Sequence, residues 1–284
     1  MLFVFGDESQ SSKQRVFAIA GLLGNADQWA ELRTKWAERT GGRVFHAADC
    51  ESGYGIYRNE PEEDRHRLHR ALTRILAESG VIGWGTGMDL ESCRREFPDA
   101  MRDQYFHSCF LRTAWKLAEY ASQCIPQDDV EFTFDRHPET EHNIRLLYKQ
   151  MVEGDDWRTR PRLASDIAFS SRAEIGIQAA DLWARELMRR LDGELFSDRS
   201  VPRIQWQSLY ATRRFGGDLL MAGHFHDLKR QMADLQVKVG MKETEYHAWL
   251  RERRIPDNRS NRILYLGFVN AKDPLKSKTL IECC

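Results

Sequence analysis

The amino-terminal part of the chain constrains the fold most, because two apolar runs there are separated by only a few polar residues. Residues 2–5 and 16–23 are almost entirely apolar, and the polar segment 10–14 lies between them. This pattern is typical of two strands joined by a hairpin turn. Strands joined in this way run antiparallel, so the sequence predicts a sheet that begins with an antiparallel pair.

Helical and strand-like patterns alternate along most of the remaining chain. Helices are predicted at 27–39, 62–78, 101–122, 142–152 and 174–191, and strands at 43–46, 81–88, 130–134 and 163–169. Strands that alternate with helices favour a sheet covered on both faces, whereas the opening hairpin requires an antiparallel portion. We therefore predict an α/β fold with a mixed β-sheet flanked by helices.

The length of 284 residues and the hydrophobic content of 42% are sufficient for one large domain with a sizeable core. The periodic pattern weakens after Gly193, and the sequence then offers one further helix, at 218–237. We expect a main domain at 1–215 and, at 216–284, a helical or irregular extension packed on it.

The chain is expected to be a cytoplasmic protein without a membrane partner. Met1 opens directly into a strand-like run without a basic segment, and no uninterrupted apolar stretch is long enough to span a bilayer. The six cysteines lack the paired spacing of a zinc ribbon, and their scattering fits a reducing compartment. The oligomeric state is not predictable from these features.

Charge is distributed unevenly, although the formal net charge is −1. Residues 1–142 carry 17 Lys and Arg against 24 Asp and Glu, whereas the remainder carries 25 against 19. The basic second half contains several arginine clusters that suit a phosphate-rich partner such as DNA or RNA. An ordinary solvated surface explains the same charges, so this pattern alone does not decide between them.

Acidic residues recur where predicted elements end or are buried. Asp7 and Glu8 follow the first apolar run. Asp135 follows the strand at 130–134, and Asp181 lies between alanine and leucine on a helix. A buried carboxylate is costly unless a positive charge offsets it, and oxygen ligands suit Mg²⁺ or Mn²⁺ better than Zn²⁺. Acids at strand ends also cap helices or pair with arginine, so a structural role is an alternative to a metal site.

Three segments resemble motifs of the bacterial domain of unknown function 3800 family. They are FGDES at 5–9, FHAAD at 45–49 and IQAADL at 177–182. The family is regarded as ribonuclease H-like, and the resemblance covers most of residues 1–195. One departure is Gln10, where the family usually has glycine. The resemblance implies a ribonuclease H-like fold and does not extend to the carboxyl-terminal extension.

The resemblance also implies roles for the acids. Asp7 matches the metal-binding acid of the first strand, Asp135 the acid at the end of the fourth strand, and Asp181 the acid of the final helix. Glu8 belongs to the first motif and would be an additional metal ligand or a base. Together they would hold one or two Mg²⁺ or Mn²⁺ ions.

Other polar residues lie close to these motifs. Gln178 is three residues before Asp181 on the same helical face, so its amide is expected to orient that carboxylate or to reach a ligand. His46 belongs to the second motif and is a candidate general acid near the site, whereas the nearby Cys50 is expected to be inert. Ser170, Ser171 and Arg172, just before the helix at 174–191, are either phosphate contacts or part of a plain loop and helix entry.

The leading hypothesis is a metal-dependent nuclease or related phosphodiesterase, since two-metal hydrolysis requires several convergent carboxylates. One alternative is a non-catalytic nucleic-acid-binding or assembly protein that keeps the fold. Another is a metal-dependent phosphohydrolase that acts on small molecules. The sequence lacks a Walker-type glycine-rich loop and a Gly-x-Ser-x-Gly elbow, which counts against nucleotide-driven motors and serine hydrolases.

Overall fold

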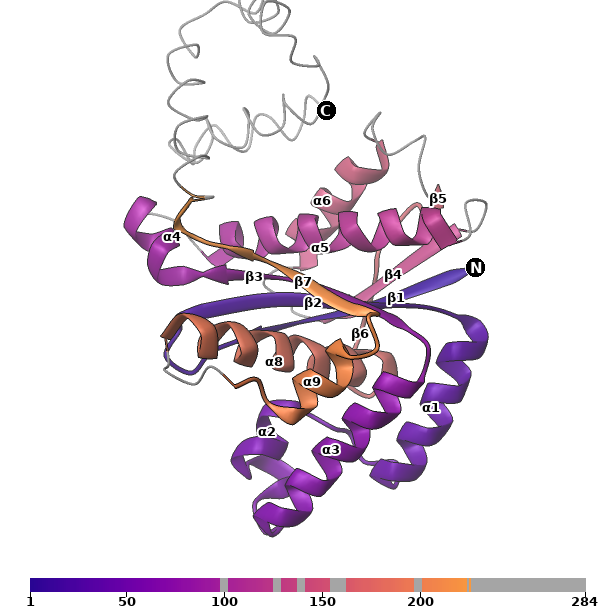
Figure 1. Ribbon diagram of the computed structural model, residues 1–284. Helices are drawn as coiled ribbons and strands as arrows, with labels where there is room; N and C mark the ends of the chain where they lie inside the picture. The colour runs from indigo at the N-terminus through magenta and orange to yellow at the C-terminus, as the bar shows by residue number, and fades with distance from the viewer. Residues whose placement is uncertain are drawn as a thin grey trace, which may run out of the picture.

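A central sheet separates two helical layers in the computed structural model (Figure 1). The described residues are 1–97, 102–124, 129–136, 141–153, 162–196, 201–223 and 225. Most of the predicted extension at 216–284 therefore lies outside the described residues. Within the described ranges, no helix combines the length and the apolar character that a bilayer crossing requires.

The sheet is mixed, which confirms the coarse fold prediction. Its strands are β1 (Leu2–Gln10), β2 (Val16–Asn25), β3 (Ile82–Asp89), β4 (Asp129–Asp135), β5 (Arg162–Leu163), β6 (Ala168–Ser170) and β7 (Phe215–Leu220). They lie in the order β5-β4-β1-β2-β3-β7, and β6 pairs with the other end of β4. β2 is antiparallel to β1 and β3, whereas β4 is parallel to β1 and β7 is parallel to β3.

Helices cover both faces of this sheet (Figure 1). One face carries α5 (Arg102–Cys124) and α6 (Glu141–Glu153), with α4 (Leu90–Glu96) at its margin. The other carries α8 (Ile175–Phe196), and outside it lie α1 (Ala26–Thr40), α2 (Ala47–Ser52), a 3₁₀ turn (Gly55–Tyr57), α3 (Glu62–Glu78) and α9 (Ile204–Tyr210). Each face has its own cluster of buried apolar side chains.

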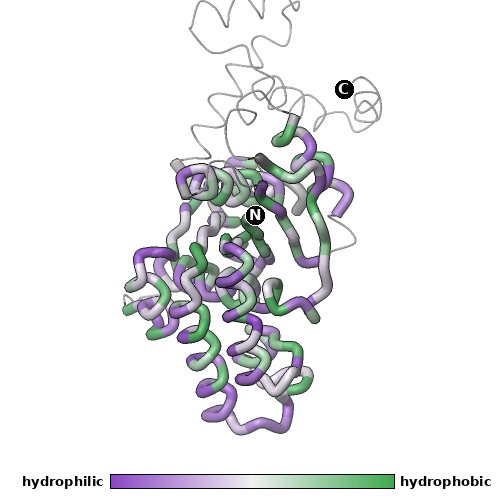
Figure 2. The backbone as a smooth tube through the Cα atoms, turned by 90° about the vertical axis from the view of Figure 1, so that its right-hand side faces the viewer, coloured by the Kyte–Doolittle hydropathy of each residue, from purple (hydrophilic) through white to green (hydrophobic). Residues whose placement is uncertain are grey.

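Helix α8 packs directly on the sheet and positions residues of the candidate site. Gly176 faces the ring of Phe5 on β1, where a Cβ atom would come within 2.4 Å of the ring. The absence of a side chain therefore lets the start of α8 approach β1 closely. Hydrophobic segments gather at the sheet, whereas the outlying helices alternate between hydrophilic and hydrophobic turns (Figure 2).

Two strand predictions are wrong in detail. Residues 43–46 form an irregular connection to α2, because the backbone N–H of Phe45 donates to the side chain of Gln178 and not to a neighbouring strand. The strand predicted at 163–169 is divided into β5 and β6, which pair with opposite ends of β4. Both corrections concern backbone groups whose partners are distant in sequence.

Two boundaries also differ from prediction. β1 does not end at the acidic pair but continues to Gln10, because β2 is long enough to pair with it as far as Phe17. The helix predicted at 218–237 is wrong at its start, since residues 218–220 complete β7 and pair with β3. The rest of that helix lies outside the described residues.

Candidate functional site

Asp7 and Asp135 are neighbours on adjacent parallel strands. The register pairs Gly6 of β1 with Phe134 of β4, so the next residues of the two strands are Asp7 and Asp135. Phe5 belongs to the apolar cluster on the α8 side of the sheet. Because side chains alternate along a strand, Asp7 projects toward the same face as Phe5. The sheet therefore directs the Asp7 carboxylate toward α8.

Asp7 carries a buried carboxylate that is only partly satisfied. Its side chain accepts a hydrogen bond from the backbone N–H of Glu8 at Oδ1, at 2.7 Å, whereas Oδ2 has no hydrogen-bond partner among the described residues. The residue is 2% exposed. Burial raises the pKa of Asp7 well above its usual value, and the nearby carboxylates of Asp181, Glu8 and Asp135 raise it further. The negative charge of Asp7 is therefore poorly compensated.

Asp181 approaches the same place from α8 and is held by the start of α2. Its Oδ2 accepts a hydrogen bond of 2.7 Å from the backbone N–H of Ala47. His46 places Nε2 3.9 Å from Oδ1 of Asp181, and its Nδ1 lies 3.0 Å from Asp49. Burial raises the pKa of Asp181, although His46 and the Ala47 hydrogen bond oppose this shift. The loop and α2 thus bring His46 beside Asp181.

Arg172 brings a positive charge beside the aspartates. Its Nε lies 3.4 Å from Oδ2 of Asp135, and its side chain is 49% exposed. Burial lowers the pKa of Arg172, but the charges of Asp7, Asp135 and Asp181 outweigh this and raise it. A half-exposed guanidinium at this position can move aside for a metal or pair with a phosphate.

Glu8 is directed differently from Asp7. The alternation along β1 directs its side chain toward the opposite face of the sheet, which α5 covers. The residue is partly exposed. Its role as an additional ligand stays a prediction, and the geometry favours an electrostatic influence on Asp7.

Gln178 does not orient Asp181 directly, which corrects the role predicted for it. Its Oε1 accepts hydrogen bonds of 3.0 Å from both Trp36 Nε1 and the backbone N–H of Phe45. Its Nε2 donates to the backbone carbonyl of Arg172 at 2.9 Å. Residues on one face of a helix can contact different partners. Gln178 therefore shares a face of α8 with Asp181 but forms its hydrogen bonds with other residues. Gln178 instead joins α1, the connection before His46 and the loop before α8.

Replacing Gln178 with alanine is expected to destabilise the fold by about 2 to 4 kcal/mol, because Trp36 Nε1 and the Phe45 N–H would lose their buried acceptor. Urea unfolding measures this change. Gln207→Ala is the matched control, since the Gln207 amide is exposed and donates only to Pro202. A change below about 0.5 kcal/mol in Gln178→Ala would contradict the anchoring role.

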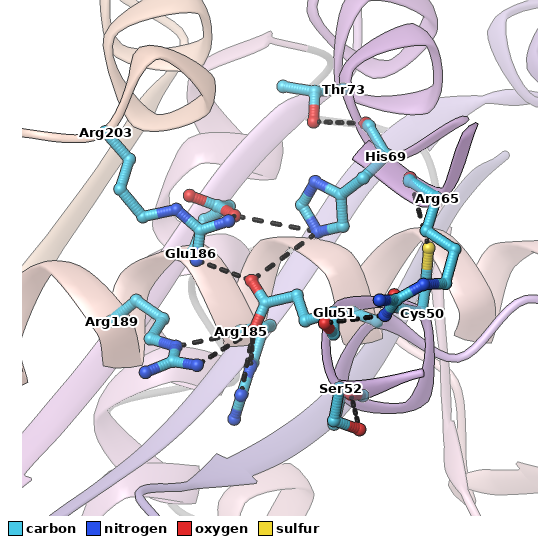
Figure 3. Close-up of polar contacts among 12 residues, drawn as sticks. Cys50, Glu51, Ser52, Arg65, His69, Thr73, Arg185, Glu186, Arg189 and Arg203 are labelled. Carbon is cyan, nitrogen blue, oxygen red and sulfur yellow. Dashed lines mark hydrogen bonds and ion pairs between the residues drawn. The ribbon is translucent and has the colours of Figure 1, made fainter. Parts of the chain in front are cut away.

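A second cluster of ionisable side chains lies between α2, α3 and α8 (Figure 3). Among the residues that the structure describes, one group of three acidic or histidine side chains has ligating atoms that all lie within 4.8 Å of one another: Glu51, His69 and Glu186. The three predicted aspartates are not gathered that closely. Glu186 and His69 are 0% and 1% exposed, and neither makes a side-chain hydrogen bond within the described chain.

Arginines occupy the space around this second cluster. Arg203 contacts Oε1 of Glu51 and lies 3.3 Å from Oε1 of Glu186, so its guanidinium bridges the two carboxylates. Arg185 and Arg189 approach Oε2 of Glu51 at 2.8 and 3.1 Å. Three guanidinium groups disfavour a further cation here. We therefore interpret the cluster as an ion-pair network that joins α2, α8 and α9.

Protonation in this network follows from burial and from the arginines. Burial opposes ionisation of Glu51, but the surrounding guanidinium groups, Arg203 foremost, lower its pKa to about 2. Burial raises the pKa of Glu186 to about 7 and lowers that of His69 to about 4. At neutral pH His69 is therefore uncharged, and Glu186 carries only part of its negative charge.

Sequence reasoning missed this network, although a signal was present. Glu186 is an acid on the same buried helix as Asp181, and the argument applied to Asp181 applies equally to it. The expectation that Cys50 is inert agrees with its burial, which raises the pKa of the thiol to about 12.

Comparisons with known proteins do not identify the chain, since no protein-family model and no curated protein matches it. The geometry itself separates two kinds of site. Asp7 keeps one carboxylate oxygen without a hydrogen-bond partner among the described residues and Asp135 pairs with Arg172 at 3.4 Å, whereas Glu51 contacts three arginines and Glu186 contacts one of them. Fewer arginines surround the first group, so it is the better candidate for a cation site.

Proposed function

We propose that the protein is a metal-dependent nuclease or phosphodiesterase whose site is formed by Asp7, Asp135 and Asp181. The observation that carries this proposal is Oδ2 of Asp7, a buried carboxylate oxygen that lies beside two other carboxylates and has no hydrogen-bond partner in the described part of the chain. Such a group is stabilised by a bound cation. The donors are oxygens, which fits Mg²⁺ or Mn²⁺.

The ribonuclease H-like fold and membership of the domain of unknown function 3800 family are part of the same proposal. Three features support it: the first three strands are antiparallel neighbours, β4 is parallel to β1, and the acids lie on β1, at the end of β4 and on α8. These are the positions at which the resemblance puts metal-binding acids. A fold alone does not imply a reaction, so the support for hydrolysis comes from the acids.

Each residue of this site would have a separate role in hydrolysis. Asp7 and Asp181 would hold the cation, and the Ala47 N–H keeps the Asp181 carboxylate fixed. Asp135 would be a further ligand when Arg172 turns toward a substrate phosphate. His46 lies at the edge of the site, where its Nε2 can exchange a proton with the reacting groups. A bound divalent cation would stabilise the charge that develops during phosphodiester hydrolysis.

Nucleic acid, whether DNA or RNA, is the proposed substrate because the residues after 142 are basic. Arg172 supports one alternative. If its guanidinium is the permanent counter-ion of the aspartates, the protein would bind nucleic acid without cleaving it.

A cleavage assay on single-stranded and duplex DNA, RNA and their hybrid, with Mg²⁺ or Mn²⁺, tests the proposal. Asp135→Asn and Asp181→Asn are each expected to lower the cleavage rate by about 10²-fold or more. Asp129→Asn, an exposed acid on the same strand as Asp135, is the matched control. Cleavage that persists in both test variants would overturn the site. Binding without cleavage by the wild type would favour the alternative, and turnover of mononucleotides alone would indicate a small-molecule phosphohydrolase.

A further inference from the structure

A pocket of about 580 Å³ opens between α3, α8 and the residues that lead into α9. We name it the arginine pocket after the basic side chains that line it, which come from all three segments: His66, Arg70, Arg189, Arg190 and Arg203. Glu51, Glu186 and Asp192 line it as well, and Trp206 forms part of its wall.

The acids of the pocket are already neutralised. Glu51 contacts three arginines, including Arg185, which is largely buried behind the pocket. Asp192 pairs with Arg15, which does not line the pocket, at 3.4 Å. Burial raises the pKa of Glu186 to about 7, which reduces its negative charge at neutral pH. The pocket therefore presents more available positive than negative charge.

Two of the arginines have only weak partners. Arg70 pairs with Glu63 at 3.1 Å, and the Glu63 side chain is 67% exposed. Arg190 pairs with Glu194 one turn away, and Glu194 is 42% exposed. Exposed pairs of this kind contribute about 0 to 1 kcal/mol, so an incoming anion displaces them at little cost. Each guanidinium also has five N–H donors, of which these pairs use few.

We propose that the arginine pocket binds a phosphate group carried by a nucleotide or an oligonucleotide. Guanidinium groups bind phosphate through paired hydrogen bonds, and Arg70 on α3 and Arg190 on α8 provide them from two separate helices. The volume is within the range of sites for small ligands and exceeds what a lone phosphate needs. Trp206 and Val201 supply apolar wall for the attached nucleoside.

The pocket lies on the same side of α8 as the carboxylate site. Asp181, Arg185 and Arg189 are spaced four residues apart, so they share one stripe of the helix. α2 follows this stripe, because Ala47 contacts Asp181 and Glu51 contacts both arginines. From the helical rise, Asp181 and Arg189 are about 12 Å apart along the axis. Phosphate binding in the pocket does not depend on hydrolysis at the carboxylate site.

Calorimetric titration of the full chain in EDTA tests the proposal, because removal of divalent metal prevents cleavage. The probes are thymidine 5′-monophosphate, thymidine and a single-stranded oligothymidylate. We expect the wild type to bind at least one phosphate-bearing probe and not thymidine. Arg70→Ala and Arg190→Ala should each weaken binding about tenfold. Arg74→Ala, an exposed arginine one turn further along α3 and outside the pocket, should change it less than about twofold.

The probes distinguish the source of the phosphate. Equal affinity for the monophosphate and the oligonucleotide would indicate a free nucleotide, whereas binding of the oligonucleotide alone would indicate a nucleic-acid backbone. No binding of any phosphate-bearing probe, or equal weakening by Arg74→Ala, would overturn the proposal. Circular dichroism of Arg70→Ala confirms that this surface variant remains folded. Because no metal is present, failure here leaves the cleavage prediction intact.

Discussion

Asp7→Asn is expected to stabilise the metal-free protein while it abolishes cleavage. The Asp7 carboxylate is buried and lies near three other acids, and one of its oxygens has no hydrogen-bond partner within the ranges that the structure describes. Asparagine keeps the shape and the hydrogen bond from the Glu8 N–H but removes the charge. We expect a gain of about 1 to 3 kcal/mol in the free energy of unfolding in EDTA at pH 7. Loss of a metal ligand should lower cleavage by about 10³-fold, equivalent to about 4 kcal/mol.

Urea unfolding in EDTA and a cleavage assay in Mn²⁺ measure the two effects. The sign of the stability effect follows from the raised pKa of Asp7, which burial chiefly causes. A folded state that holds its proton more tightly than the unfolded chain loses stability as pH rises above the unfolded pKa, so the gain should shrink at acidic pH. Glu131→Gln, at an exposed position on β4, is the control. Destabilisation of the metal-free Asp7→Asn protein would contradict the assignment of an uncompensated charge.

Glu51→Gln is expected to cause a large loss of stability. The Glu51 carboxylate is 10% exposed and neutralises Arg185, Arg189 and Arg203, of which Arg185 is itself only 12% exposed. The pKa of Glu51 is about 2 in the folded protein, against an ordinary value of 4.5. At 1.36 kcal/mol for each pKa unit, ionised Glu51 contributes about 3 kcal/mol at neutral pH. Glutamine resembles the protonated acid, so Glu51→Gln should lose the stabilisation that ionised Glu51 contributes.

The pH dependence provides a second check on Glu51. A lowered folded-state pKa stabilises the fold above pH 4.5, and this contribution is lost as pH falls toward 2. The difference between wild type and Glu51→Gln should therefore be largest above pH 4.5 and disappear near pH 2. Glu60→Gln, which breaks the exposed pair with Arg43, should change stability by less than about 1 kcal/mol at any pH. A pH-independent difference for Glu51→Gln would show that packing and not charge is responsible.

The regular elements were predictable because their signals are local. The helix predicted at 62–78 coincides with α3, since an amphipathic pattern runs through it and Pro61 precedes its first turn. The opening hairpin and the end of β4 at Asp135 followed from apolar runs bounded by polar residues. The connection at 43–46 was not predictable in this way, because its hydrogen-bond acceptor Gln178 is 133 residues away.

The candidate site was only partly predictable for the same reason. An acid within an apolar helical pattern can be recognised in the sequence, and this pattern predicted a functional role for Asp181. Other features depend on tertiary contacts and could not be predicted from local patterns. They are the Asp7 oxygen that has no hydrogen-bond partner among the described residues, the ion pair of Arg172 with Asp135, and the hydrogen bond from the Ala47 N–H to Asp181. Gln178 is the clearest example. Its spacing from Asp181 predicted the correct face of the helix, but it did not predict which residues its amide would bind.

Mn²⁺ binding, measured by electron paramagnetic resonance, tests the central claim most directly because it compares the two clusters. The wild type and Glu186→Gln should bind Mn²⁺, and Asp7→Asn should not, since the account assigns the cation to the aspartates and treats Glu51, His69 and Glu186 as an arginine-bound network. Binding that survives in Asp7→Asn and is lost in Glu186→Gln would contradict the account and assign the metal to the second cluster.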